Sequence, residues 1–205
     1  MRRLRAWRDA FTLLDVGELV ARWLEGKIEE TPWYPAPAAE ETAELVSTLA
    51  RLNRLGLVTT QSQPGRRLDK SGCAQRAAVE AMASETIARR VAALTLYTPL
   101  IVFPFKPGDA GGRMVPITLD EFHPFTWMGS HSEYDDLAET KESLNVFAFA
   151  ACAAAWTVVV IDPVWGRKRY MWDALERAVS STEPLAARFD ITPAESLDLD
   201  DDLVT

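Results

Sequence analysis

The chain has 205 residues, of which 48% are hydrophobic and 25% are charged, values typical of a globular protein. This composition excludes a fully disordered chain, a collagen-like repeat and a disulfide scaffold. Lys and Arg number 22 against 30 Asp and Glu, so the formal net charge is −8. We expect no binding to nucleic acid or to an anionic membrane through bulk electrostatics, since both need a concentrated basic face.

The negative charge is concentrated at the C-terminal end of the chain. Residues 181–205 hold seven acidic residues with Arg188 as their only base, whereas residues 1–8 hold four arginines and no acid. We expect a single globular domain over residues 1–182, with a helical N-terminal segment. Residues 183–205 are expected to form a flexible acidic tail.

The N-terminal quarter of the chain predicts two helices. Apolar residues recur at helical spacing over residues 3–26, with a break expected near Asp15–Gly17. The stretch 31–39 contains three prolines and must be a loop. The second helix spans residues 40–55 and ends at Gly56, where a glycine commonly closes a helix.

The following segments alternate between strand and helix patterns. Residues 57–60 form a short β-rich run that leads into a polar turn at 61–65. Residues 75–96 have an apolar side with many small residues and are expected to form one long helix. A strand is expected over residues 99–105, followed by a glycine-rich turn.

The second half of the chain contains three more strand patterns. Strands are expected over residues 114–122, 125–128 and 157–161, and helices over 143–156 and 170–180. The unbroken β-branched run at 157–161 is typical of a central strand that is covered on both faces. The pattern as a whole favours an α/β or α+β protein, with a mixed β-sheet flanked by helices in a single domain.

The cysteines and the longest apolar run bear on the compartment. Cys73 and Cys152 have no nearby thiol and no metal-ligand spacing, which is typical of reduced structural cysteines in a cytoplasmic protein. The longest apolar run, residues 146–161, is shorter than the ~20 residues that a membrane-spanning helix needs. We therefore expect a cytoplasmic protein without a membrane partner.

The two histidines are the strongest hint of a metal site. His123 and His131 lie eight residues apart, and each is two residues from a glutamate. A hairpin could bring them together around a divalent ion. No HExxH or paired-cysteine spacing supports this arrangement, so we expect exposed loop histidines, with no metal and no cofactor.

A first candidate binding segment covers residues 60–65. Thr60, Gln61, Ser62 and Gln63 carry short uncharged polar groups, and the Pro-Gly pair that follows fixes a turn. Hydroxyls and amides on a stiff turn suit hydrogen bonding to a sugar, an amide or a base edge. The alternative is that these residues only finish an edge strand and its turn.

A second candidate segment covers residues 162–167. Asp162 follows a buried strand at the end where α/β proteins place ligand groups, Trp165 offers a flat stacking face, and Arg167 offers a fork for carboxylate or phosphate. Arg76, at an expected helix start, could also face an anion. The alternative is an Asx turn at Asp162, a core tryptophan and a surface arginine.

Catalysis is left open by the sequence. Ser62, His123 and Asp162 can be written as a nucleophile set, with Ser62 and Asp162 as the candidate catalytic residues. The chain has no Gly-x-Ser-x-Gly elbow and no phosphate loop, so neither acyl transfer nor nucleotide hydrolysis is supported. Whether the protein is an enzyme stays uncertain.

Six short motifs distinguish this chain, and they are DVGEL (15–19), WLEG (23–26), LARLNR (49–54), SQPG (62–65), QRAAV (75–79) and VIDPVWGR (160–167). With these motifs the chain resembles a family of proteins of unknown function from Streptomyces, related actinobacteria and their phages and plasmids. The resemblance covers the chain to about residue 180 and implies a cytoplasmic protein of that origin, without a catalytic role for any residue.

The leading hypothesis is a pocket for a small polar molecule, such as a nucleotide, formed by residues 60–65 and 162–167. It requires that both segments end neighbouring parallel strands, so that their turns line one crevice. The alternative is a non-enzymatic protein-interaction factor, such as a phage- or plasmid-borne inhibitor or accessory protein. Its working surfaces would be exposed Trp33 and Tyr34, the basic N-terminus and the acidic tail.

Overall fold

The computed structural model describes residues 5–131 and 142–180. The chain begins with α1 (Arg5–Arg8) and α2 (Leu13–Leu24). Thr12 and Asp15 form a capping box, in which each side chain accepts a hydrogen bond from the other residue's backbone N–H. The break in the first predicted helix therefore lies at residues 9–12, a few residues before the expected Asp15–Gly17.

The proline-rich loop is fastened to the helical layer. Trp7 Nε1 donates to Glu30 O at 3.2 Å, and Trp23 Nε1 donates to Ala36 O at 2.8 Å. The ring of Trp33 packs edge-on against Trp7, with 5.7 Å between the centroids. Trp33 is thus partly buried and packs against the core, so the expectation of an exposed Trp33 is wrong.

The helix predicted over residues 75–96 is wrong in its first part. The first part of this range forms β2 (Ala74–Gln75) and β3 (Ala78–Ala83), and only the second part is helical, as α4 (Glu85–Ala92) and the 3₁₀ turn η2 (Ala93–Leu96). Ala, Glu and Met favour helices in isolation, but the small side chains of β3 fit a strand that is covered on both faces. The helix starts where Ser84 Oγ accepts a hydrogen bond from Ile87 N.

The principal sheet has four strands in the order β1-β3-β7-β4. Each adjacent pair is antiparallel, so the class is α+β and this sheet is antiparallel where a mixed sheet was expected. The strands other than β3 are β1 (Leu57–Gln63), β4 (Ile101–Phe105) and β7 (Trp156–Ile161).

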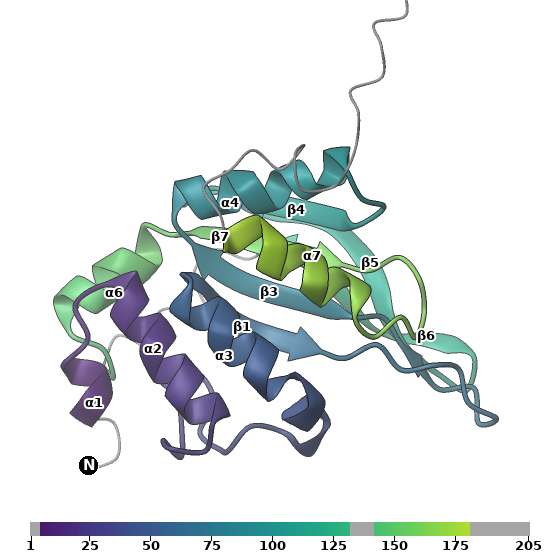
Figure 1. Ribbon diagram of the computed structural model, residues 1–205, viewed down its shortest axis with the longest axis horizontal. Helices are drawn as coiled ribbons and strands as arrows, with labels where there is room; N and C mark the ends of the chain where they lie inside the picture. Colours follow the sequence, from purple (N-terminus) through teal and green to yellow (C-terminus); the bar gives the residue numbers. More distant parts are fainter. Residues whose placement is uncertain (1–4, 132–141, 181–205) are drawn as a thin grey trace, which may run out of the picture.

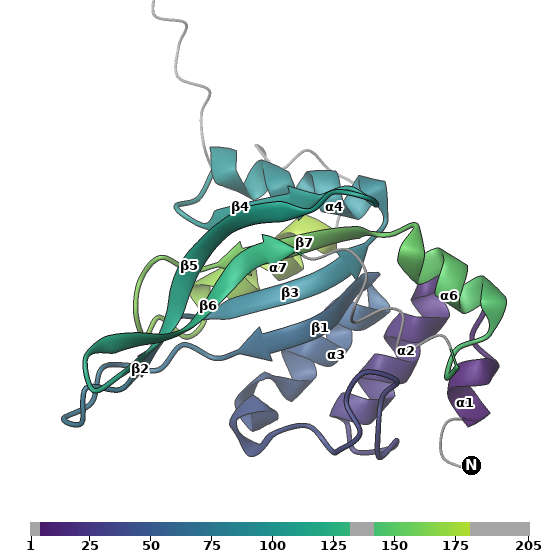
Figure 2. The ribbon, with the colours of Figure 1, turned by 180° about the vertical axis from the view of Figure 1, so that it is seen from behind.

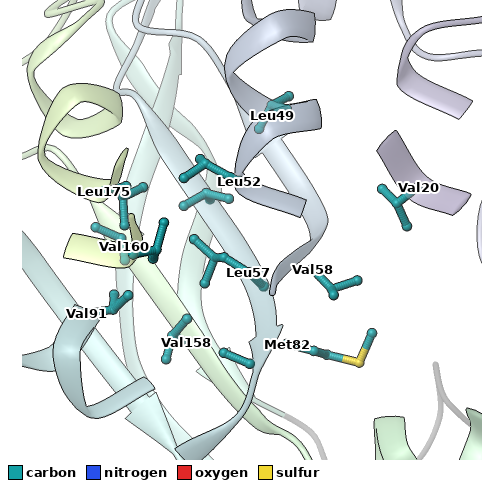
Figure 3. Packing of buried hydrophobic residues seen from close by; sticks show 14 of the residues in the cluster. Val20, Leu49, Leu52, Leu57, Val58, Met82, Val91, Val158, Val160 and Leu175 are labelled. Carbon is teal, nitrogen blue, oxygen red and sulfur yellow. The ribbon is translucent and has the colours of Figure 1, made fainter. Parts of the chain in front are cut away.

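Helices cover one face of this sheet (Figure 1). The layer includes α2, the 3₁₀ helix η1 (Glu40–Leu45) with α3 (Val46–Arg54), α4 and α7 (Tyr170–Val179), while α6 (Val146–Ala153) packs beside α2. Figure 3 shows residues of the sheet, such as Val158 and Val160, facing Leu175 and Leu52 of the helices. Among the described residues, no helix has the length and apolarity needed to span a membrane.

A long hairpin lies against the opposite face of the sheet (Figure 2). Strands β5 (Gly111–Asp120) and β6 (His123–His131) pair with each other, and β2 joins the far edge of β5 to give a second antiparallel sheet. A second core forms between hairpin and sheet because inward residues of both meet there. Its buried members are Ala78, Phe105, Ile117, Met128, Val159 and Ile161.

Candidate functional site

The two segments singled out by the sequence lie at the same end of the principal sheet. Strands β1 and β7 both pair antiparallel with β3. They therefore run in the same direction, and their C-terminal ends lie at the same end of the sheet (Figure 1). They are not neighbours, as the hypothesis required, because β3 lies between them. The start of β3 therefore contributes a third segment to this place.

The three segments are joined through their backbones. Asp162 N donates to Ala77 O at 2.9 Å, and Gly166 N donates to Gln75 O at 3.0 Å. Gly65 packs so closely on the turn after β7 that a Cβ there would collide with the carbonyl group of Arg167. We call this junction of residues 62–65, 75–77 and 162–167 the corner. Its SQPG and QRAAV sequences are in contact with VIDPVWGR, which lies far from both along the chain.

Asp162 is fully buried and completely engaged. Its Oδ1 accepts a hydrogen bond from Val164 N at 2.9 Å, which forms an Asx turn. Arg167 donates through Nε to Oδ2 at 2.6 Å and through Nη2 to Oδ1 at 2.7 Å. The guanidinium carbon of Arg167 lies 3.9 Å from the ring centroid of Tyr170. The pair therefore fixes the turn that carries Trp165.

Arg76 lies beside this pair with fewer partners. It is not at a helix start, as was expected, but in the link between β2 and β3. Its guanidinium carbon stacks 4.3 Å from the ring centroid of Trp165, and Nη1 donates to Pro116 O at 2.8 Å. Nε is buried and has no hydrogen-bond partner within the described part of the chain. Burial lowers the pKa of Arg76, and the charge of Asp162 acts in the opposite direction.

Gln63 connects the corner to the hairpin. Its Nε2 donates to Arg76 O and to Ile117 O, both at 2.9 Å. These two bonds use both N–H groups of the amide, while the amide oxygen is not part of them. The Gln63 side chain thus links β1 to the hairpin through its NH₂ group, and its amide oxygen takes no part in this link.

The remaining residues of the first segment lie on the edge strand. Thr60 sits at a bulge in β1 and donates through Oγ1 to the Glu80 carboxylate at 3.0 Å, and Gln61 is exposed. Glu80 was not among the predicted site residues because it fell in the predicted helix. Ser62 is opposite Val79 in the ladder, and its hydroxyl makes no hydrogen bond among the described residues.

The three residues of the candidate nucleophile set, Ser62, His123 and Asp162, do not lie together in the structure. Val79, the partner of Ser62, pairs in turn with Val160, and Asp162 is two residues after Val160, just beyond the end of β7. With strands about 4.8 Å apart, Ser62 and Asp162 are separated by about 10 Å across the sheet alone. His123 is exposed at the start of β6, opposite Asp120. No hydrogen bond joins any two of the three.

The described residues contain no group of three or more His, Cys, Asp or Glu side chains that could hold a metal ion. The side chain of His131 lies outside the described residues. Both cysteines are free thiols, and burial raises the pKa of Cys152 to about 11. Cys73 donates weakly to Asp120 Oδ1 at 3.3 Å, which ties the loop before β2 to the hairpin turn.

Comparison with known sequences places the chain in a family but gives no activity. Residues 2–182 match the family described as "Domain of unknown function (DUF6919)", and the chain belongs to this family. It is also 32% identical over 66 residues to "Methylenetetrahydrofolate reductase 1" of Schizosaccharomyces pombe. That similarity covers 32% of this chain and 11% of the reductase, so the chain matches a small part of that enzyme.

Proposed function

We propose that this member of the family binds a small polar ligand, such as a nucleotide, at the corner. The observation that carries the proposal is the convergence of segment 162–167 with the much earlier segments 62–65 and 75–77, which places Gln63, Arg76 and Trp165 together and leaves each partly exposed. An amide, a guanidinium and an aromatic ring held on rigid backbone are typical of sites that orient small polar molecules.

The neighbouring residues support this assignment by keeping the site rigid. Asp162 and Arg167 hold the turn that carries Trp165, since every bond of that carboxylate is directed into the turn. Thr60 and Gln61 lie on the adjoining edge strand and would contact the more distant part of a larger ligand. Preorganised groups bind more tightly because less conformational entropy is lost on binding.

Binding without catalysis fits the corner better than a reaction. Asp162 would have to release Arg167 before it could accept a substrate proton. Ser62 has no base within hydrogen-bond reach among the described residues. We therefore assign Asp162 a positioning role, and we propose no chemical step at Ser62.

A thermal-shift screen tests the proposal. The probes are nucleosides, nucleotides, sugars and amino acids, and methylenetetrahydrofolate is added because of the similarity to the reductase. A probe at about 100 times its Kd should stabilise the chain by about 2.7 kcal/mol, which raises Tm by roughly 5–10 °C. The shift should disappear in Trp165→Leu and persist in Trp127→Leu, a matched change of an exposed tryptophan on the hairpin. Equal shifts in both variants would reject the corner.

A second candidate function is protein interaction, and the hairpin favours it. Met114, Phe125 and Trp127 of β5 and β6 are 51%, 63% and 46% exposed, which is unusual for side chains of this size. A photocrosslinking residue at position 127 should give a discrete adduct in lysate of the producing cell. The same residue at exposed Ser47, on the helical layer, is the control. Identical adducts at both positions, or none, would reject this function.

The cytoplasmic location and the actinobacterial or phage origin stay predictions. The location rests on the cysteine pattern and on the absence of a long apolar run in the sequence. The origin rests on the resemblance of the six motifs alone.

A further inference from the structure

We infer that the ligand carries an oxyanion, a carboxylate or a phosphate group, and that the Nε/Nη2 edge of Arg76 receives it. This inference rests on the proposed binding function and names the chemical class of the ligand. It also selects one of the two arginines that the sequence offered for an anion, since Arg167 is already paired with a carboxylate.

Three arginines among the described residues have guanidinium groups that lie over aromatic rings. Arg167 lies over Tyr170 and directs Nε and Nη2 to Asp162. Arg89 lies over Trp156 at 5.4 Å and directs the same two nitrogens to Glu85. In both arginines, the guanidinium edge formed by Nε and Nη2 contacts a carboxylate. The planar fork of the guanidinium group favours this arrangement.

Arg76 has the same stacked arrangement without the carboxylate. Its guanidinium lies over Trp165, and the single hydrogen bond of that group among the described residues uses Nη1. Nε is buried without an acceptor, and buried donors are rarely left unpaired in folded proteins. The Nε/Nη2 edges of Arg167 and Arg89 both bind carboxylates, so the missing partner of Arg76 is also an oxyanion.

The local charge fits an anionic ligand. Two guanidinium cations, those of Arg76 and Arg167, share the single carboxylate of Asp162, which is committed to Arg167. The corner therefore keeps one cation without a matched counterion, in a chain whose formal net charge is −8. A carboxylate or phosphate would supply that counterion and two acceptor oxygens at once.

The geometry also restricts how the oxyanion enters. Trp165 covers one face of the guanidinium, and the bond to Pro116 O holds its opposite end, so the plane of the group is fixed. Nε itself is covered, whereas the Arg76 side chain as a whole is partly exposed. An oxyanion therefore meets Nη2 first and displaces the cover of Nε, and Trp165 fluorescence reports the change.

The test follows the Nε–Hε resonances of arginines in the ¹⁵N-labelled full chain. Titration with inorganic phosphate should shift the Arg76 resonance saturably and leave those of Arg167 and Arg89 in place, because their Nε groups already bind carboxylates. Sodium chloride at matched ionic strength is the control. An Arg76 resonance that does not move, or that moves equally with chloride, would overturn the inference.

Variants give a second, independent readout. Arg76→Lys keeps the charge but loses the fork, and should weaken phosphate binding about tenfold or more. Arg89→Lys removes a stacked arginine outside the corner and should leave binding unchanged. If a neutral probe from the screen binds through Trp165 while the Arg76 resonance stays silent, the oxyanion is wrong and the ligand site stands. If neither phosphate nor any screened probe acts at the corner, both proposals fail.

Discussion

The corner has two halves that use similar residues for different ends. In one half, Asp162 and Arg167 satisfy each other, and Tyr170 covers the guanidinium. In the other half, Arg76 and Trp165 are stacked in the same way, but the guanidinium edge that binds carboxylates has no partner among the described residues. A satisfied ion pair shapes its own turn, whereas a guanidinium without a carboxylate keeps its binding capacity for another molecule.

The largest effect is expected in the satisfied half. Arg167→Met leaves the fully buried carboxylate of Asp162 without its cation, and should lower the free energy of unfolding by about 2–4 kcal/mol. The value is below that of a fully buried pair because the Arg167 side chain is 29% exposed. Urea unfolding monitored by tryptophan fluorescence measures it.

A double-mutant cycle is the control for this prediction. Asp162→Ala combined with Arg167→Met should cost less than the sum of the single changes, since the second change removes the charge that the first leaves unpaired. A cost below about 1 kcal/mol for Arg167→Met alone would remove the distinction between the two halves.

The next effect is expected at the contact between β1 and the turn after β7. Gly65→Ala places a Cβ against the backbone of Arg167, which cannot move without displacing the Asp162 turn. We expect a loss of about 1–3 kcal/mol in urea unfolding, together with weaker phosphate binding. Gly26→Ala is a comparison at a glycine with open space, although its positive φ adds backbone strain. Unchanged stability in Gly65→Ala would contradict the close packing of the corner.

A smaller effect is expected in the unsatisfied half. Arg76→Met removes a cation whose Nε is unpaired and retains most of the apolar contact with Trp165, so stability should change by less than about 1 kcal/mol. The phosphate-dependent change in tryptophan fluorescence should be lost. A destabilisation as large as that of Arg167→Met would show that Arg76 is a structural residue like its neighbour.

The fold was predictable where local pattern and tertiary context agree. The β-branched run that forms β7 and the apolar stripes of α3 and α7 specify the elements found there. Strand β3 was missed because Ala78, Glu80 and Met82 have helical preferences, and their place between β1 and β7 is not encoded locally. The helix signal that exists, Ser84 as an N-cap, lies in the middle of the predicted range.

The candidate site was predictable only in part. The polar turn residues and the carboxylate after a buried strand indicated which segments to compare, and these do lie at the same end of the sheet. The sequence does not distinguish Arg76 from Arg167. The turn at Asp162 pairs Arg167 with the carboxylate, whereas Arg76 is held by Pro116 O. The role of Gln63 likewise depends on Ile117, 54 residues away.

The smallest effect is expected at Ser62, and it separates binding from catalysis. The Ser62 hydroxyl makes no hydrogen bond among the described residues, and no base reaches it. Ser62→Ala should therefore change the free energy of unfolding by less than about 0.5 kcal/mol and leave the phosphate titration of Arg76 unaltered. Retained binding places the recognition of the ligand in the Arg76 half of the corner. If Ser62→Ala abolishes binding while the protein stays folded, the edge strand makes the decisive contact, and the comparison of the two arginines loses its functional meaning.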